Sequence, residues 1–152
     1  MLTKSQAKLF FLAGTIIFSL LFLALSYDTT FNRVDKQTHA ENLTAEVIAG
    51  RELWDANNCM GCHTLLGEGA YYAPELTKVI ERRGEGYVKG ALTSATPWGE
   101  NIHGRKMVVY KFSNEQADQL VAFFKWIGEI DANGFPAKPL YKVEKIDSDS
   151  DL

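Results

Sequence analysis

The chain has 152 residues and a formal net charge of -3, from 16 Lys and Arg against 19 Asp and Glu. This length suffices for one compact domain plus an appendage, but not for two sizeable cores. A nucleic-acid-binding protein usually carries a basic excess, and this chain has none. Its two cysteines, Cys59 and Cys62, are too close in sequence for a disulfide framework, so we expect them to carry chemistry.

The first element in chain order is an apolar N-terminal segment. All residues from Leu9 to Tyr27 are uncharged, and as a helix they would span roughly 28 Å, close to the hydrocarbon thickness of a bilayer. Lys4 and Lys8 precede the segment and Asp28 follows it. This charge pattern predicts a cytoplasmic N-terminus and sends the rest of the chain across the membrane.

A cleaved signal peptide is the alternative, with Ala24 and Ser26 as the small residues before the cut. The apolar part of a signal peptide is usually about 7–15 residues long, and the segment here is longer. The length therefore favours a retained anchor. Both interpretations place the remaining chain outside the cytoplasm.

Changes in composition along the chain predict its domain organisation. Residues after the apolar segment are polar, mixed in charge and without a periodic apolar pattern, and the C-terminus alternates Ser and Asp. We therefore divide the chain into a cytoplasmic tip and transmembrane anchor (1–27), a stalk (28–43), one domain (44–140) and a mobile acidic tail (141–152).

The domain is expected to be all-α, because no segment shows the sustained alternation of apolar and polar residues that a sheet requires. Glycine and proline between Gly61 and Pro74 indicate a loop rather than a strand. Caps, periodicity and breakers predict four helices, at residues 44–57, 76–83, 87–94 and 113–131.

The last of these helices has the clearest signals. Ser113 and Gln116 have the spacing of a capping box. Residues at helical spacing predict a core face of Ala117, Leu120, Val121, Phe124 and Ile127. A second stripe, made of Phe123, Trp126 and Ile130, is either further core or a contact face for a partner subunit.

The motif that carries chemistry is Cys59-Met60-Gly61-Cys62-His63, the attachment signature of c-type haem. Two thiols on one tight turn can add to the two vinyl groups of one haem, and the adjacent histidine then reaches the iron. A structural zinc site normally needs four Cys or His ligands, and a thioredoxin-like dithiol needs a preceding strand. The motif therefore predicts one covalently bound haem c.

A sixth iron ligand follows by elimination. Met1 is the initiator, and Met60 lies inside the motif, on the wrong side of the iron. Met107 remains, and a thioether ligand raises the reduction potential, as suits an electron carrier. His103 is the rival ligand, and core packing is the alternative role for Met107. With both axial positions filled, the chain is expected to move electrons without substrate chemistry of its own.

A longer stretch around the motif is more distinctive than the motif itself. It resembles the small cytochrome c subunit of bacterial nitric oxide reductase. The likeness also includes the N-terminal anchor and the segment around Met107. The matching stretches are Trp54 with residues 57–76, which end in G-E-G-A-Y-Y-A-P-E-L, and also Arg82-Arg83-Gly84, Phe124-Lys125-Trp126-Ile127 and Asn133-Gly134-Phe135-Pro136.

The resemblance implies a class I-like cytochrome c domain in the periplasm, anchored by one pass in the bacterial inner membrane with a cytoplasmic N-terminus. It also implies a large polytopic partner subunit. Members of that family take electrons from a soluble cytochrome c or a blue-copper protein and pass them to a low-spin haem b in the large subunit. The electrons then reach a haem b3–iron pair, where two NO become N2O. The family's axial pair corresponds to His63 and Met107.

The resemblance further implies a calcium ion shared with the large subunit, contacted by the Gly69 carbonyl and Tyr71. The alternative for these two residues is an ordinary turn followed by a core aromatic. One departure is that Val108 follows Met107, where many family members have proline. Two other functions stay open for the chain, a free-standing membrane-anchored electron shuttle for another oxidase or reductase and a ligand-sensing haem protein.

Overall fold

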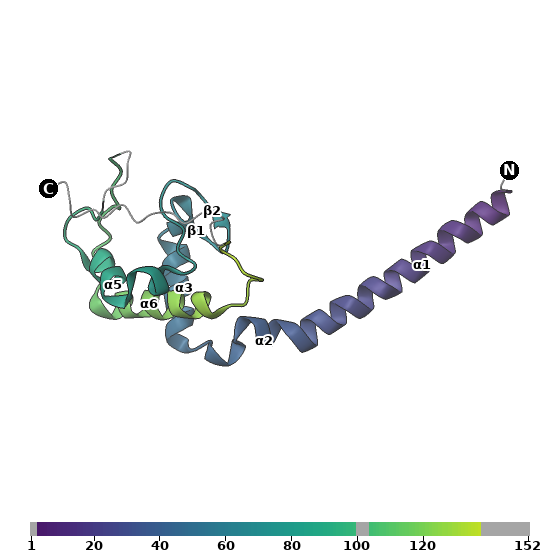
Figure 1. Ribbon diagram of the computed structural model, residues 1–152, viewed down its shortest axis with the longest axis horizontal. Coiled ribbons are helices and arrows are strands. Elements are labelled where there is room, and N and C mark those ends of the chain that lie inside the picture. The colour runs from purple at the N-terminus through teal and green to yellow at the C-terminus, as the bar shows by residue number, and fades with distance from the viewer. Residues whose placement is uncertain (1–2, 100–103, 138–152) are drawn as a thin grey trace. The chain divides into compact units, whose positions relative to one another are not determined.

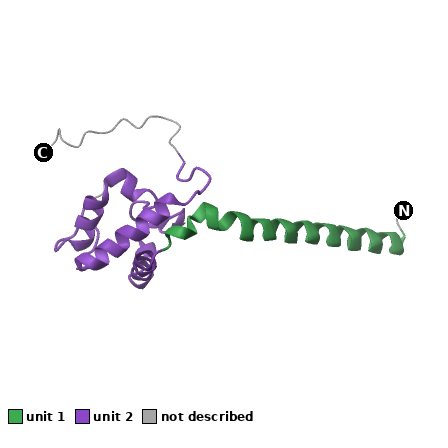
Figure 2. Ribbon diagram, turned by 90° about the horizontal axis from the view of Figure 1, so that it is seen from below, with its two compact units in different colours: residues 1–43 green, residues 44–152 purple. Residues whose placement is uncertain are grey.

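A computed structural model describes residues 3–99 and 104–137 of the chain (Figure 1). The chain divides into two compact units, residues 1–43 and 44–152 (Figure 2). Within the described residues the fold is mostly helical, as the sequence predicted. The acidic tail at 141–152 and the rival ligand His103 lie outside the described residues.

The first unit is dominated by α1 (Lys4–Asp28), a single long helix. Thr3 caps its start, and the Gln6 side chain completes the capping box. None of its residues is buried by the rest of the chain. In the described part of the chain, the helix that begins at Lys4 is the one long and apolar enough to cross a membrane. The sequence-based expectation of an apolar N-terminal helix is confirmed.

The helix continues past the apolar segment into residues whose sequence shows no periodic apolar face. These elements are a π-helical turn η1 (Thr29–Arg33), α2 (Val34–Thr38) and a 3-10 turn η2 (Ala40–Asn42). Asp28 accepts hydrogen bonds of 2.9 Å from Asn32 Nδ2 and from Arg33 Nε. Pairs of side chains four and five residues apart thus support a polar helix that buries nothing, which is why apolar periodicity did not reveal it.

The second unit contains the predicted domain. Thr44 and Ser113 cap its two longest helices, and Ser113 forms the predicted capping box with Gln116. The two middle helices are shifted by two or three residues from the predicted starts and are separated by Gly84. The helices of this unit are α3 (Ala45–Ala56), the 3-10 turn η3 (Cys59–Gly61), α4 (Val79–Arg83), α5 (Glu85–Thr93) and α6 (Asn114–Glu129).

The core of this unit lies between α3 and α6, which share its most extensive interface. The predicted core face of α6 is confirmed, since all five of its residues are buried. The structure also resolves the second stripe of α6. Phe123 is only 4% exposed and belongs to the core, whereas Trp126 and Ile130 are partly buried and pack against it.

A short antiparallel hairpin was not predicted. It pairs β1 (Thr64–Leu65) with β2 (Glu68–Gly69). The intervening Leu66 and Gly67 both have positive φ, 50° and 85°, as a two-residue hairpin turn requires. Two residues per strand are too few for an alternating pattern to show in the sequence. The expectation of a pure loop between Gly61 and Pro74 was therefore wrong at these positions.

Two ion pairs join α5 to α6 on the outside of the unit. Lys89 Nζ lies 2.6 Å from Asp118 Oδ1, and Lys125 Nζ lies 2.7 Å from Glu85 Oε1. At the other end of α6, the Lys78 ammonium donates to the Gly128 carbonyl. These contacts join α5 and Lys78, the residue that precedes α4, to α6.

Candidate haem site

The haem motif begins directly after α3 on a tight turn. Asn58 has a φ of +50° and redirects the chain. The Cys59 carbonyl then accepts hydrogen bonds from the backbone N–H groups of Cys62, at 3.1 Å, and His63, at 2.9 Å. Two successive donors on one carbonyl wind Cys59 to His63 into a compact turn. The structure thus brings both cysteines and the histidine together, as the motif spacing predicted.

The two cysteines differ in environment, and no disulfide joins them. Cys59 is buried and Cys62 is exposed. Burial raises the pKa of the Cys59 thiol to about 11, with a further contribution from the neighbouring Cys62. Cys59 is therefore uncharged at neutral pH.

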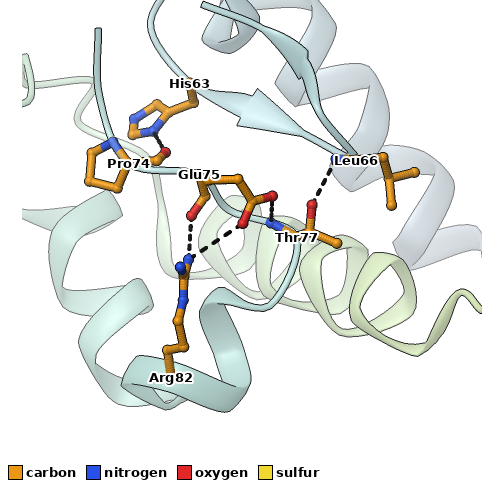
Figure 3. Close-up of polar contacts among 6 residues, drawn as sticks. All are labelled: His63, Leu66, Pro74, Glu75, Thr77 and Arg82. Atoms are coloured by element: carbon orange, nitrogen blue, oxygen red, sulfur yellow. Dashed lines mark hydrogen bonds and ion pairs between the residues drawn. The ribbon is translucent and has the colours of Figure 1, made fainter. Parts of the chain in front are cut away.

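One hydrogen bond orients the imidazole of His63. Its Nδ1 lies 2.7 Å from the Pro74 carbonyl oxygen, and because a carbonyl can only accept, Nδ1–H is the donor (Figure 3). Burial lowers the pKa of His63. The ring is consequently a neutral imidazole with its proton on Nδ1, which leaves the Nε2 lone pair for a metal.

Aromatic side chains from two helices support the histidine. The Trp54 ring of α3 lies 6.4 Å from the His63 ring, between centroids. Phe123 and Phe124 of α6 contact the same tryptophan at centroid distances of 6.3 Å and 5.6 Å. The His63 ring therefore packs, through Trp54, against the α3–α6 core.

The segment after β2 folds back along the motif turn. Three backbone N–H groups donate to carbonyls of the motif region at 2.8–2.9 Å, in the pairs Ala70 to Met60, Ala73 to Cys62 and Leu76 to Thr64. These three bonds hold Pro74 where its carbonyl meets His63.

A buried threonine fixes the far end of this segment. The Thr77 hydroxyl accepts a 2.7 Å hydrogen bond from the Leu66 N–H, and its own N–H donates to Glu75 Oε1 at 2.7 Å (Figure 3). The Arg82 guanidinium donates a hydrogen bond to the backbone carbonyl of Glu75. Thr77 is 1% exposed. It ties the hairpin turn to the segment that ends at α4.

Met107 lies on a separate segment, which pairs with Trp98. The Trp98 N–H donates to the Met107 carbonyl at 3.2 Å, and the Met107 N–H donates to the Trp98 carbonyl at 2.9 Å. Met107 is partly buried against the core that also contains Cys59. The pKa of Tyr110 is raised by burial and then by the nearby Cys59 and Cys62. The Met107 segment and Cys59 of the motif turn therefore pack against the same core.

These donors fit a haem c: two unlinked cysteines on one turn, a neutral histidine with a free Nε2, and a thioether on a second segment. Among residues 3–99 and 104–137, no group of three His, Cys, Asp or Glu side chains is placed to hold a metal ion. The zinc alternative thus has no ligand set in this part of the chain.

Gly69, in β2, and Tyr71, just after β2, follow the haem motif turn, and both are exposed. Gly69 has a φ of +117°, and a β-carbon there would lie 2.3 Å from the His63 carbonyl oxygen, so only glycine fits. The Tyr71 side chain is 84% exposed. The alternative role of Tyr71 as a core aromatic is therefore wrong.

Several site residues were missed in the sequence. Pro74 acts through a backbone carbonyl, which carries no residue-type signal. Trp98 pairs through its backbone with a residue beyond a loop. Tyr72 and Arg105, whose guanidinium lies 4.2 Å from the tyrosine ring centroid, approach each other from distant segments. Trp98, which lies shortly before Met107 in the sequence, was the one sequence feature that pointed to this backbone pairing.

Comparison with known proteins gives two results. Residues 47–128 match the Cytochrome c family, a span from α3 to the end of α6. This match supports haem c as the cofactor of the chain.

The chain is also similar over nearly its whole length to curated proteins named as the C subunit of nitric oxide reductase. It is 40% identical to that of Halomonas halodenitrificans over 145 residues, 91% of this chain and 96% of the relative. The identity is 41% to that of Stutzerimonas stutzeri over 139 residues (88% and 93%) and 36% to that of Paracoccus denitrificans over 141 residues (89% and 94%).

Proposed function

This chain belongs to the family of nitric oxide reductase C subunits and is an electron-transfer cytochrome c subunit of that enzyme; on this premise we propose which of its residues hold the haem that carries the electron. Cys59 and Cys62 hold a single haem c through two thioether bonds. When the haem is bound, His63 and Met107 would be the two protein ligands of its iron. The haem iron, when bound, supplies a one-electron Fe(III)/Fe(II) couple.

The orientation of His63 is the observation that carries this proposal. Its Nδ1–H donates to the Pro74 carbonyl at 2.7 Å, so the ring cannot rotate without breaking that bond. Because Nδ1–H donates to a carbonyl acceptor, Nε2 becomes the better electron-pair donor to a metal. Trp54 behind the ring limits its displacement.

Met107 completes the proposed ligand pair from the opposite segment. Its side chain is partly buried against the core that also contains Cys59. If His63 and Met107 both ligated the haem iron, no position on it would remain for NO. Its role is to accept an electron and pass it on, while the bond chemistry takes place elsewhere in the enzyme.

We propose a soluble periplasmic cytochrome c or blue-copper protein as the donor and haem b of the large polytopic subunit as the acceptor. The large subunit then reduces two NO to N2O. Family membership supports a catalytic partner of this kind. The identity of the donor rests on the resemblance described above.

We propose that α1 is retained as a single-pass anchor in the bacterial inner membrane. Lys4 and Lys8 at its start support a cytoplasmic N-terminus, with the haem domain in the periplasm. The proposed domain limits stay at 1–27, 28–43, 44–140 and 141–152. The break between the two compact units, after residue 43, supports the boundary between stalk and domain.

We also propose that the Gly69 carbonyl and the Tyr71 side chain contact a calcium ion shared with the large subunit. The exposure of Tyr71 supports this role, since a large aromatic that is 84% exposed in the isolated chain suits a covered position in a complex. Gly69 has a φ of +117°, which glycine adopts without strain, and its close approach to the His63 carbonyl fixes its backbone beside the motif turn.

The ligand assignment can be tested by Met107→Ala, with Met60→Leu as the matched methionine control. We expect Met107→Ala to keep its covalent haem but to lose the methionine–iron charge-transfer band and NO consumption with a reduced soluble donor. Met60→Leu should keep the band. If Met107→Ala retains the band, Met107 is not the ligand and the proposed pair must be abandoned.

A further inference from the structure

The segment that carries Met107 is braced at two points outside the haem motif. The first is the pair of backbone hydrogen bonds with Trp98, of 3.2 Å and 2.9 Å. They form an isolated antiparallel bridge, so the backbone of Met107 cannot leave that of Trp98 without breaking these two bonds. The position of the thioether therefore depends on what holds Trp98.

The side chain of Trp98 is held on α5. Its ring packs against Tyr87 edge to face, with centroids 5.7 Å apart and planes at 76°. A β-carbon on Gly90 would lie 3.5 Å from Trp98 Cη2, so the indole lies directly over this glycine. The Arg83 guanidinium lies 5.3 Å from the Tyr87 ring. Through Trp98, the Met107 backbone is thus attached to α5.

The second brace joins the segments of the two axial ligands. Arg105 Cζ lies 4.2 Å from the centroid of the Tyr72 ring, within the range of a cation–π interaction. Arg105 is two residues before Met107, and Tyr72 is two residues before Pro74, the hydrogen-bond acceptor of His63. This contact links the segment that supports the fifth ligand to the segment that supplies the sixth.

We propose that Trp98 and Tyr72 are positioning residues that keep Met107 on the haem iron. This inference rests on the proposed role of Met107 as axial ligand. Val108, directly after Met107, is 63% exposed and supplies no comparable packing. The ligand segment is therefore kept in place by tertiary contacts. When a brace is removed, the state with Met107 off the iron gains population, and the iron becomes open to an external ligand.

The magnitude of each effect follows from the kind of contact. The cation–π contact involves two exposed side chains. Its loss should therefore raise the population with Met107 off the iron about two- to fivefold. Loss of the Trp98 ring removes an aromatic contact and the indole packing together, and should raise it about tenfold or more. Tyr72→Phe keeps the ring face and should stay close to the unchanged chain.

The test uses the full-length, haem-loaded chain in detergent, with carbon monoxide as the probe of its ferrous form. We expect the apparent CO affinity to rise two- to fivefold in Tyr72→Leu and about tenfold in Trp98→Ala, with a weaker charge-transfer band in the ferric form. Trp98→Phe should fall between the unchanged chain and Trp98→Ala. Lys89→Gln, which breaks an exposed α5–α6 ion pair, is the control for a change in α5 that leaves both braces intact, and it should leave CO affinity unchanged.

The outcomes separate this proposal from the one on which it rests. If the unchanged chain lacks the methionine–iron band and binds CO as readily as Met107→Ala, the ligand assignment fails. The proposed roles of Trp98 and Tyr72 then fail as well. If the unchanged chain has the band but Tyr72→Leu and Trp98→Phe bind CO like Lys89→Gln, only the braces are overturned. Graded CO affinity across the Tyr72 and Trp98 variants would establish them.

Discussion

Gly50 of α3 lies so close to Gln119 of α6 that a β-carbon at position 50 would lie 2.1 Å from the Gln119 carbonyl oxygen. The two main helices of the haem domain therefore touch through their backbones at this point. Phe123 is the next neighbour, at 2.8 Å from the same β-carbon position. The close crossing is what allows Trp54, one turn further along α3, to reach both Phe123 and Phe124.

Gly50→Ala should therefore destabilise the domain strongly. The methyl group would meet backbone rather than the end of a flexible side chain, so the helices must separate. We expect the free energy of unfolding to fall by about 1–3 kcal/mol or more, measured by chemical denaturation of the haem-loaded chain. Gly86→Ala in α5 is the matched control. Its β-carbon meets nothing within 4 Å, and alanine there should be neutral or stabilising by up to about 1 kcal/mol. Equal stability of the two variants would contradict the close crossing.

Thr77→Val should loosen the hairpin beside the haem motif. Valine has nearly the same shape but cannot accept the 2.7 Å hydrogen bond from the Leu66 N–H. Leaving that donor unpaired should cost about 1–3 kcal/mol of unfolding free energy. Thr77→Ser retains a hydroxyl and should recover most of the loss. Hydrogen exchange at the Leu66 amide gives a local measurement. Slow exchange in Thr77→Val would show that the bond does not protect this amide.

Tyr71→Phe should weaken assembly with the large subunit or lower activity, because it removes the oxygen proposed to contact calcium. Tyr72→Phe is the matched control, since it removes a hydroxyl from the neighbouring tyrosine and retains the ring that faces Arg105. Calcium content and NO consumption of the purified complex are the two measurements. Unchanged calcium and unchanged activity in Tyr71→Phe would exclude Tyr71 from the calcium site.

The ion pair between Lys89 and Asp118 should contribute little to stability despite its 2.6 Å length. The two side chains are 37% and 60% exposed, so water and salt screen their attraction. We expect a double-mutant cycle of Lys89→Gln and Asp118→Asn to give a coupling of at most about 1 kcal/mol, smaller at high salt. A larger coupling that is insensitive to salt would mean that the pair is shielded from solvent.

Features encoded by neighbouring residues were predictable in this protein. Two helix starts are predicted by the capping residues Thr44, Ser113 and Gln116, because their side chains satisfy backbone donors within three residues. The apolar segment predicts α1 because length and hydrophobicity alone decide whether a helix suits a bilayer. The two-residue strands of the hairpin and the helical stalk were missed, since neither leaves a periodic apolar pattern.

The sequence by itself determined the haem motif, the N-terminal apolar helix and the capped ends of α3 and α6, because each depends on interactions within a few residues. Only the tertiary structure decided that Pro74 accepts from His63, that Phe123 is core and that Trp98 pairs with Met107. These contacts join residues that are distant along the chain or depend on how helices pack. A carbonyl or a ring reaches its partner only after the intervening chain has folded, and residue type alone does not encode that path.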